Sequence, residues 1–101
     1  MSNDPLFRMK VEDAFGIASR GTVAVGRIEQ GTLSLGDEVD IQRGGSTKRV
    51  VIAGLEMFHK TLNQAKAGYN VGVLLKDVGR DDVQQGDMLM GVGGGDFIWK
   101  P

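Results

Sequence analysis

Few side chains in this 101-residue sequence have the types and spacing that catalysis or metal binding requires. Two carboxylates are adjacent at Glu12 and Asp13, but neighbouring residues of a regular strand point to opposite faces and would not share a site. The single histidine, His59, has no cysteine or second histidine to complete a metal site, and its polar segment favours a solvated surface position. No Ser, His and Asp are spaced to support a nucleophilic triad. We therefore expect binding without catalysis, and neither a metal nor a cofactor.

Two glycine-rich stretches could in principle hold a phosphate group. The stretch RGGSTKR, residues 43–49, has the residue types of a P-loop in the wrong order, and no helical pattern follows it. It is more typical of a flexible hairpin tip. The stretch GVGGGD, residues 91–96, lacks the strand and helix that flank a dinucleotide-binding motif, so it is interpreted as a linker.

The composition limits the class of partner. Twelve basic and thirteen acidic residues give a net charge of -1, whereas a protein that holds long duplex DNA by charge is usually basic. A small local nucleic-acid site stays compatible with this balance. The chain has no cysteine, no basic-then-apolar leader pattern, and no apolar run near the roughly 18 residues of a membrane span. We expect a cytoplasmic protein that does not bind membranes or DNA.

Short β-branched segments separated by glycines indicate strands joined by turns. In the first segment, Val11, Asp13, Phe15 and Ile17 are predicted to share one face. Glycines inside two other segments predict a bulge or close packing at Gly26 and a break or bend at Gly54. A brief helical turn is expected before the last strand, and no segment has a sustained helical stripe. The predicted strands cover residues 6–17, 22–29, 38–42, 47–58, 70–76 and 87–90, with a short apolar pair at 33 and 35. This pattern predicts an all-β barrel or sandwich.

These elements place polar residues next to apolar strand residues at Asp13, Arg20, Glu56 and Asn70. Such residues could form a ligand site. Turn chemistry and solvated rim charges would explain the same pattern, because charged residues at strand ends are commonly exposed.

Three stretches, VEDAFGIASRGTVAVGRIEQGTLSLGDEVDI, GLEMFHKTL and AGYNVGVLLKDVGRDDVQQGDML, resemble the second domain of elongation factor Tu and related translational GTPases. The resemblance runs from about Pro5 to Met90. It implies a small closed antiparallel β-barrel, which we assign to residues 1–91, and residues 92–101 then form a glycine-rich hinge with an apolar tail. The family's role in protein synthesis implies that this barrel binds the 3′ end of aminoacyl-tRNA, or a related RNA or ribosomal partner.

The resemblance also implies two groups of binding residues. The pocket for the terminal adenine would be lined by Ile17, Ser19, Val23, Glu56 and Leu74, with Glu56 against the base. The cleft for the aminoacyl group would be bordered by Glu12, Asp13, Phe15, Val25, Phe58, His59 and Asn70. An apolar slot with one polar edge can hold a flat base without a net positive charge.

At four positions the sequence departs from the family. Ser19 replaces glycine, which adds a side chain to the pocket, and Val25 replaces threonine, which removes a hydroxyl group. His59 replaces arginine and so lacks a permanent charge and a bidentate donor. Tyr69 replaces an acidic residue. No P-loop is present, so GTP hydrolysis is not expected, and a separate GTPase is a candidate partner.

A second hypothesis needs no RNA. The barrel would be a protein-interaction or scaffold module with a vestigial pocket, and its tail would dock through Phe97, Ile98 and Trp99 on the barrel, a second copy or another protein. The alternative for the tail is a terminus without fixed structure.

Overall fold

The computed structural model describes residues 3–18 and 20–92. Ser19 and the tail residues Phe97, Ile98 and Trp99 lie outside the described residues. Every helix and strand assigned within these ranges is as follows: β1 (Arg8–Ile17), β2 (Gly21–Gln30), β3 (Thr32–Ser34), β4 (Glu38–Arg43), β5 (Ser46–Met57), β6 (Lys60–Thr61), β7 (Gln64–Lys66), β8 (Asn70–Lys76), the 3-10 turn η1 (Arg80–Asp82) and β9 (Met88–Gly91).

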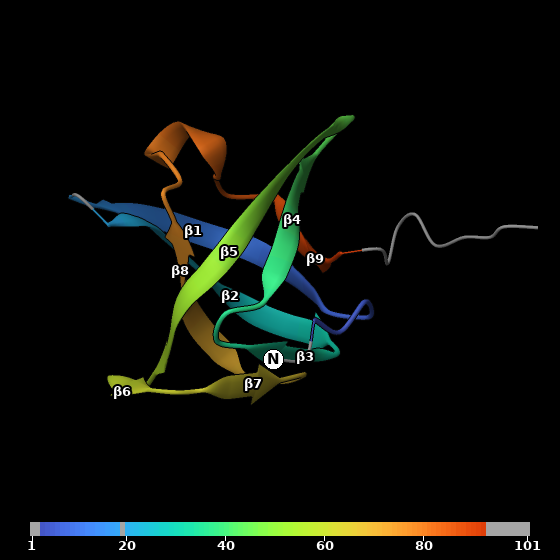
Figure 1. The fold of residues 1–101 in the computed structure, drawn as a ribbon, viewed down its shortest axis with the longest axis vertical. Helices are drawn as coiled ribbons and strands as arrows, with labels where there is room; N and C mark the ends of the chain where they lie inside the picture. The colour runs from blue at the N-terminus through green and yellow to red at the C-terminus, as the bar shows by residue number, and fades with distance from the viewer. Residues whose placement is uncertain (1–2, 19, 93–101) are drawn as a thin grey trace, which may run out of the picture.

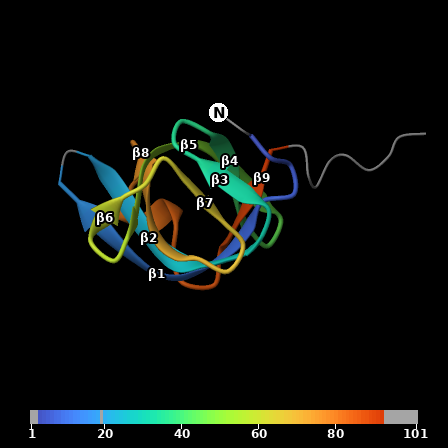
Figure 2. The same cartoon turned by 90° about the horizontal axis from the view of Figure 1, so that it is seen from below.

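Six strands form a closed ring. They are hydrogen-bonded in the order β4-β9-β1-β2-β8-β5, and β5 pairs again with β4 to close the sheet, each pair being antiparallel (Figure 1). The short strand β6 extends the sheet beyond β5, and β3 pairs with β7 in a separate ladder that lies across one end of the ring (Figure 2). The predicted small closed antiparallel β-barrel is confirmed. No helix in the described ranges is long and apolar enough to cross a membrane.

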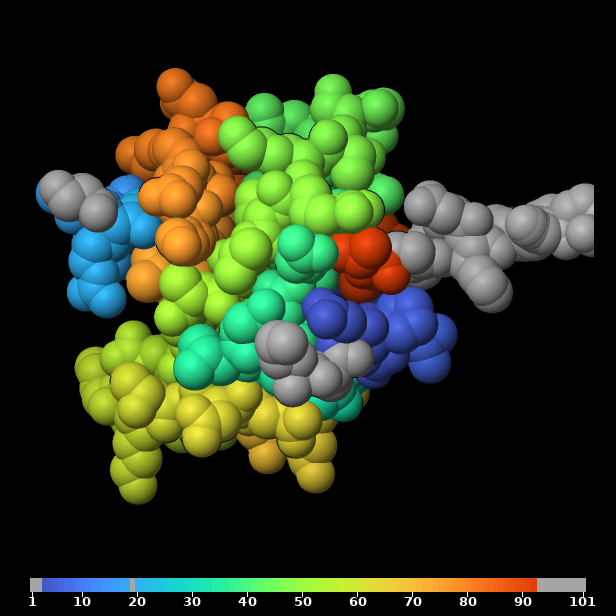
Figure 3. All heavy atoms as spheres, viewed as in Figure 1, coloured from blue at the N-terminus to red at the C-terminus, as the bar shows by residue number. Residues whose placement is uncertain are grey.

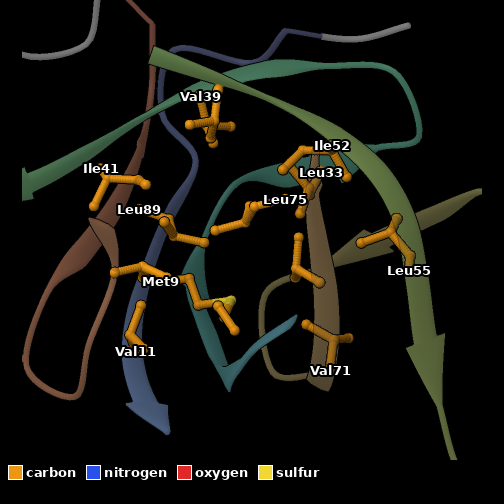
Figure 4. Packing of buried hydrophobic residues seen from close by; sticks show 14 of the residues in the cluster. Met9, Val11, Leu33, Val39, Ile41, Ile52, Leu55, Val71, Leu75 and Leu89 are labelled. Carbon is orange, nitrogen blue, oxygen red and sulfur yellow. The ribbon is translucent and has the colours of Figure 1, made fainter. Parts of the chain in front are cut away.

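Alternating apolar residues fill the ring. Side chains from β1, β4, β5, β8 and β9 point inward and meet in one cluster (Figure 4). Leu33 of β3 and Ala65 of β7 belong to the same cluster. Met9, Val73, Leu75 and Leu89 are fully buried there. The burial of these side chains supplies the main driving force for folding of the barrel.

A bulge in β1 corrects one prediction about its faces. Val11 pairs with Gly26 and Asp13 pairs with Val25, so Glu12 is an extra residue in β1. Val11 is therefore buried whereas Asp13, Phe15 and Ile17 are exposed, and the expectation that all four share a face is wrong. The bulge also makes β1 irregular at the two carboxylates, and both Glu12 and Asp13 are exposed.

Both glycine predictions agree with the structure. A side chain at Gly26 would place its Cβ 2.2 Å from the carbonyl oxygen of Lys10, so the backbones of β1 and β2 approach closely there. The register between β5 and β8 shifts between Ile52 and Gly54, which is the expected irregularity of the long strand. The expected helical turn is η1. In the segment from 59 to 68, the sequence indicated only a polar turn, and the structure adds β6 and β7.

Candidate functional site

The outer face of β1, β2, β8 and β5 carries two rows of residues that the strand register brings side by side. Antiparallel pairing aligns directly opposite residues on the same face, at a separation that lets their side chains interact. The first row is Phe15, Val23, Leu74 and Gly54, and the second row is Asp13, Val25, Gly72 and Glu56.

A cavity of about 460 Å³ opens on this face. Four of the five residues predicted for a base pocket line it, namely Ile17, Val23, Glu56 and Leu74, while the fifth, Ser19, lies outside the described residues. Its volume falls within the roughly 300–1,000 Å³ typical of small-ligand sites. In Figure 3 the surface is hollowed beside the end of the β1–β2 hairpin, above the yellow β6–β7 segment.

At two glycines the cavity is lined by backbone alone, and no side chain projects into it. Gly72 lies between Val25 and Glu56, and a Cβ placed on it would lie 3.4 Å from Cγ1 of Val23. A Cβ on Gly54 would lie 3.4 Å from Cβ of Leu74. Each added atom would make ordinary contact and would occupy space that is now open. A flat ligand can therefore lie against the backbone at these two positions.

The cavity combines an apolar floor with polar groups at its edge. Val23, Leu74 and Ile17 provide the apolar surface, whereas Glu56 and Arg20 provide opposite charges. Glu56 is exposed, and within the described ranges its carboxylate makes neither an ion pair nor a side-chain hydrogen bond. Such a carboxylate can accept hydrogen bonds from an amino or hydroxyl group of a ligand.

The sequence did not single out several other residues of the cavity. Leu35 follows β3, and its backbone N–H donates to the carbonyl of Asn63, which joins the β3–β4 loop to the β6–β7 connection. Leu62 and Asn63 line the cavity from that connection, and Thr61 lines it from β6. In the sequence, Leu35 and Leu62 could be recognised only as apolar residues. Their position at the cavity could not be predicted, because it depends on the pairing of β3 with β7.

The residues predicted for an aminoacyl cleft are only partly brought together. Asp13, Phe15 and Val25 belong to the two rows, and the Asp13 carboxylate accepts a hydrogen bond from the N–H of Ala14 at 2.8 Å. Asn70 pairs with Arg27, one row further along. Glu12 lies apart from the rows, in a separate depression that it lines together with Arg27.

Phe58 and His59 form the tip of the β5–β6 hairpin. Met57 pairs with Lys60, and the two residues between them have φ values of 54° and 63°. Positive φ at both central positions is the geometry of a type I′ turn, which favours Asn-Gly and is unusual for a bulky side chain. Backbone in this region costs on the order of 1–3 kcal/mol per residue. The strained turn holds the Phe58 ring 80% exposed, two residues beyond Glu56.

An ion pair between the exposed Arg43 and the buried Asp87 fixes the barrel end that carries η1. Nε and Nη2 of Arg43 each donate to a carboxylate oxygen of Asp87 at 2.9 Å, and the N–H of Gln84 donates to the same carboxylate. Burial by itself raises the pKa of Asp87, but these hydrogen bonds outweigh it and hold the pKa below its ordinary value of 3.8. This arrangement is structural, since Asp87 is 3% exposed. In the parts of the chain that the structure describes, no three acidic, His or Cys residues cluster as metal ligands would.

The fold and the site define a class: a small closed antiparallel barrel with an apolar, glycine-floored cavity on its outer face. The family model for elongation factor Tu domain 2 matches residues 21–90, which is most of the chain. The chain belongs to the elongation factor Tu domain 2 family, whose members are β-barrel domains of translation factors. The resemblance noted in the sequence began earlier, at about Pro5, and ended at the same residue.

Proposed function

We propose that this barrel binds the 3′ end of an aminoacylated RNA without catalysing a reaction. The terminal base enters the cavity between Val23, Leu74 and Glu56, and the aminoacyl group extends along the second row toward Asp13 and Val25. The observation that carries this proposal is the cavity itself, because it combines four of the residues expected from the family with an open floor.

The chemistry of the cavity suits an adenine ring. The two faces of the base are apolar, so they gain from contact with Val23 and Leu74. Its exocyclic amino group is a hydrogen-bond donor, which matches the acceptor oxygens of Glu56.

The proposal can be tested by amide NMR, with the protein titrated with a short aminoacylated RNA ending in CCA. Saturable shifts are expected at Ile17, Glu56 and Leu74. Leu74→Ala and Glu56→Ala should each weaken binding about tenfold, which corresponds to about 1.4 kcal/mol. Val51→Ala and Glu38→Ala are matched controls because these residues lie on the outer face of β5 and β4, away from the cavity. Absence of shifts at millimolar RNA contradicts the proposal.

Protein contact is a second candidate function. Two aromatic rings are largely exposed near the cavity, with Phe15 at 51% and Phe58 at 80%, and exposed aromatic residues are common at protein interfaces. A GTPase domain is the partner that the family suggests. If this candidate holds, Phe58→Ala should weaken capture of a translational GTPase domain, and Glu56→Ala should leave it unchanged.

A further inference from the structure

The outer face of β9 carries two methionines on the side of the barrel away from the cavity proposed for the base. β9 lies between β1 and β4, and in the ring it stands opposite β8 (Figure 1). Leu89 is fully buried, so its neighbours Met88 and Met90 point outward, where both are partly exposed. No residue of β9 lines the cavity proposed for the base.

Strand pairing surrounds the two methionines with polar groups. Their direct neighbours are exposed or half-exposed side chains of β1 and β4, except for the buried Asp40, and comprise Arg8, Lys10, Asp40 and Gln42. Asp40 pairs with Arg49 of β5 at 3.2 Å. We call the surface formed by Met88, Met90, Arg8 and Lys10 the methionine face.

The described chain leaves the barrel at the edge of the methionine face. The N–H of Gly91 donates to the carbonyl of Phe7 at 2.9 Å, so the chain after Val92 continues from a point beside Leu6. Leu6 is 64% exposed, which adds an apolar side chain near this point. Figure 3 shows red atoms of the β9 segment at the surface, next to the blue N-terminal segment.

The positive charges next to the methionine face are only partly neutralised. Arg8 pairs with Glu29 at 3.5 Å, whereas Lys10 and Arg27, which lie directly opposite each other, make no ion pair within residues 3–18 and 20–92. Like charges in this arrangement destabilise a sheet. Both cations line a depression of about 380 Å³, in which Glu12 is the acidic residue without an ion pair to another described residue. A further carboxylate placed there would relieve the repulsion.

The residues that follow β9 in the sequence suit this surface. Residues 93–101, GGGDFIWKP, contain three glycines that allow the chain to reverse its direction, then an acidic residue and three apolar ones. Residues 96–100 reach about 17 Å when extended, whereas Gly91 and Met88 are about 10 Å apart along β9. A tail that turns at the glycines is therefore long enough to cover both methionines.

We propose that this tail folds back on its own barrel and docks on the methionine face. The rings of Phe97 and Trp99 lie against the two methionines, because thioether groups make favourable contacts with aromatic rings. The carboxylate of Asp96 lies beside Lys10 and supplies the missing negative charge. The short tether gives the tail a high effective concentration at its own barrel, which favours this docking over a second copy. The docked tail leaves the cavity proposed for the base open, so the inference does not depend on RNA binding.

Methionine methyl NMR tests the contact on the whole chain. Ring currents should shift the methyl signals of Met88 and Met90. The double variant Phe97→Leu, Trp99→Leu keeps the apolar bulk and removes the rings, so it should abolish both shifts. The signal of Met57 on β5 should stay unchanged and serves as the internal control. Both substitutions leave the barrel sequence intact, so the test does not depend on the stability of a barrel variant.

The single tryptophan of the chain gives a second measurement. Acrylamide should quench Trp99 several-fold less in the native protein than in the urea-unfolded chain. Replacing Met88 and Met90 together by glutamine should restore the quenching, with circular dichroism showing the barrel folded. Phe58→Gln is the matched control, because it removes an exposed apolar side chain at the distant β5–β6 hairpin. Lys10→Gln should restore part of the quenching, and high salt should reproduce its effect.

Three results would overturn the proposal. The first is no change of the Met88 and Met90 signals in the double leucine variant. The second is a set of shifts that appears only at high protein concentration, which would place the tail on a second copy. The third is a response of Leu74 in place of Met90, which would place the tail in the cavity proposed for the base. Titration with a CCA-ending RNA separates this inference from the proposed function, because the tail variants should leave RNA affinity unchanged.

Discussion

Replacing Gly72 with alanine should narrow the cavity proposed for the terminal base, called the base cavity below, without harming the barrel. The added Cβ would lie 3.4 Å from Cγ1 of Val23, which is ordinary van der Waals contact, and the backbone at Gly72 is not left-handed. Glycine-to-alanine changes at such positions stabilise a protein by about 0.4–1 kcal/mol, mainly by restricting the unfolded chain. For a domain of this size, that corresponds to a rise of about 2–8 °C in melting temperature.

The same methyl group should weaken ligand binding. A single extra carbon in an apolar pocket changes affinity by about 1–3 kcal/mol, or about 10- to 200-fold. Gly72→Ala should therefore bind a CCA-ending RNA at least about tenfold less tightly than the wild type. Thermal unfolding followed by circular dichroism measures the first effect, and fluorescence anisotropy with labelled RNA measures the second.

Gly45→Ala is the control, because a Cβ at that hairpin position meets nothing within 4 Å. It should share the effect of Gly72→Ala on the unfolded chain and leave RNA affinity unchanged. A folded Gly72→Ala variant with wild-type affinity would refute the assignment of the base to this cavity. A marked fall in its melting temperature would refute the geometry of the two rows.

Three further changes test the barrel itself. Gly26→Ala should destabilise it by about 2–3 kcal/mol, because the new Cβ would lie 2.2 Å from the Lys10 carbonyl oxygen; urea unfolding would measure this loss. Thr22→Val should lower the free energy of unfolding by about 1–3 kcal/mol, because the buried hydroxyl donates to the Val78 carbonyl at 2.7 Å and a valine side chain cannot donate a hydrogen bond. An unchanged unfolding midpoint would contradict this reasoning. Asp87 has a lower pKa in the folded state than in the unfolded chain, so its stabilisation is complete above about pH 4 and is lost as the pH falls below 3.8. Melting curves between pH 2 and pH 6 should show this loss in the wild type and a weaker dependence in Asp87→Asn.

The sequence was sufficient to predict most strands of the barrel, because alternating apolar residues indicate where the strands lie. It was insufficient for β1, where one extra residue at Glu12 moves Val11 to the inside and Phe15 to the outside. Gly26 predicted a bulge or close packing on β2, but it did not indicate that the extra residue would lie in the partner strand at Glu12. The strands β6 and β7 were missed because they are short and polar, and only pairing with β5 and β3 stabilises them.

The base cavity could be anticipated only through the family. Val23, Gly54 and Leu74 become neighbours through pairing between strands that are far apart in the sequence, and no local pattern specifies that register. The resemblance predicted cavity residues on β1, β2, β5 and β8. It did not predict Leu35 or Asn63, whose positions follow from a backbone hydrogen bond between two loops. The role of these residues in RNA binding stays a prediction.

The pairing of β1 with β9 has a consequence for engineering. Arg8 lies opposite Met90, and the N–H of Gly91 donates to the Phe7 carbonyl at 2.9 Å, so the described segment starts and finishes at neighbouring points. Domains with adjacent ends tolerate circular permutation and insertion into host loops. New ends fit best at Gly44 and Gly45, where the β4–β5 turn has open space around it. The domain can thus be inserted into a host loop through its adjacent ends, with the cavity lined by Val23, Glu56 and Leu74 left uncovered.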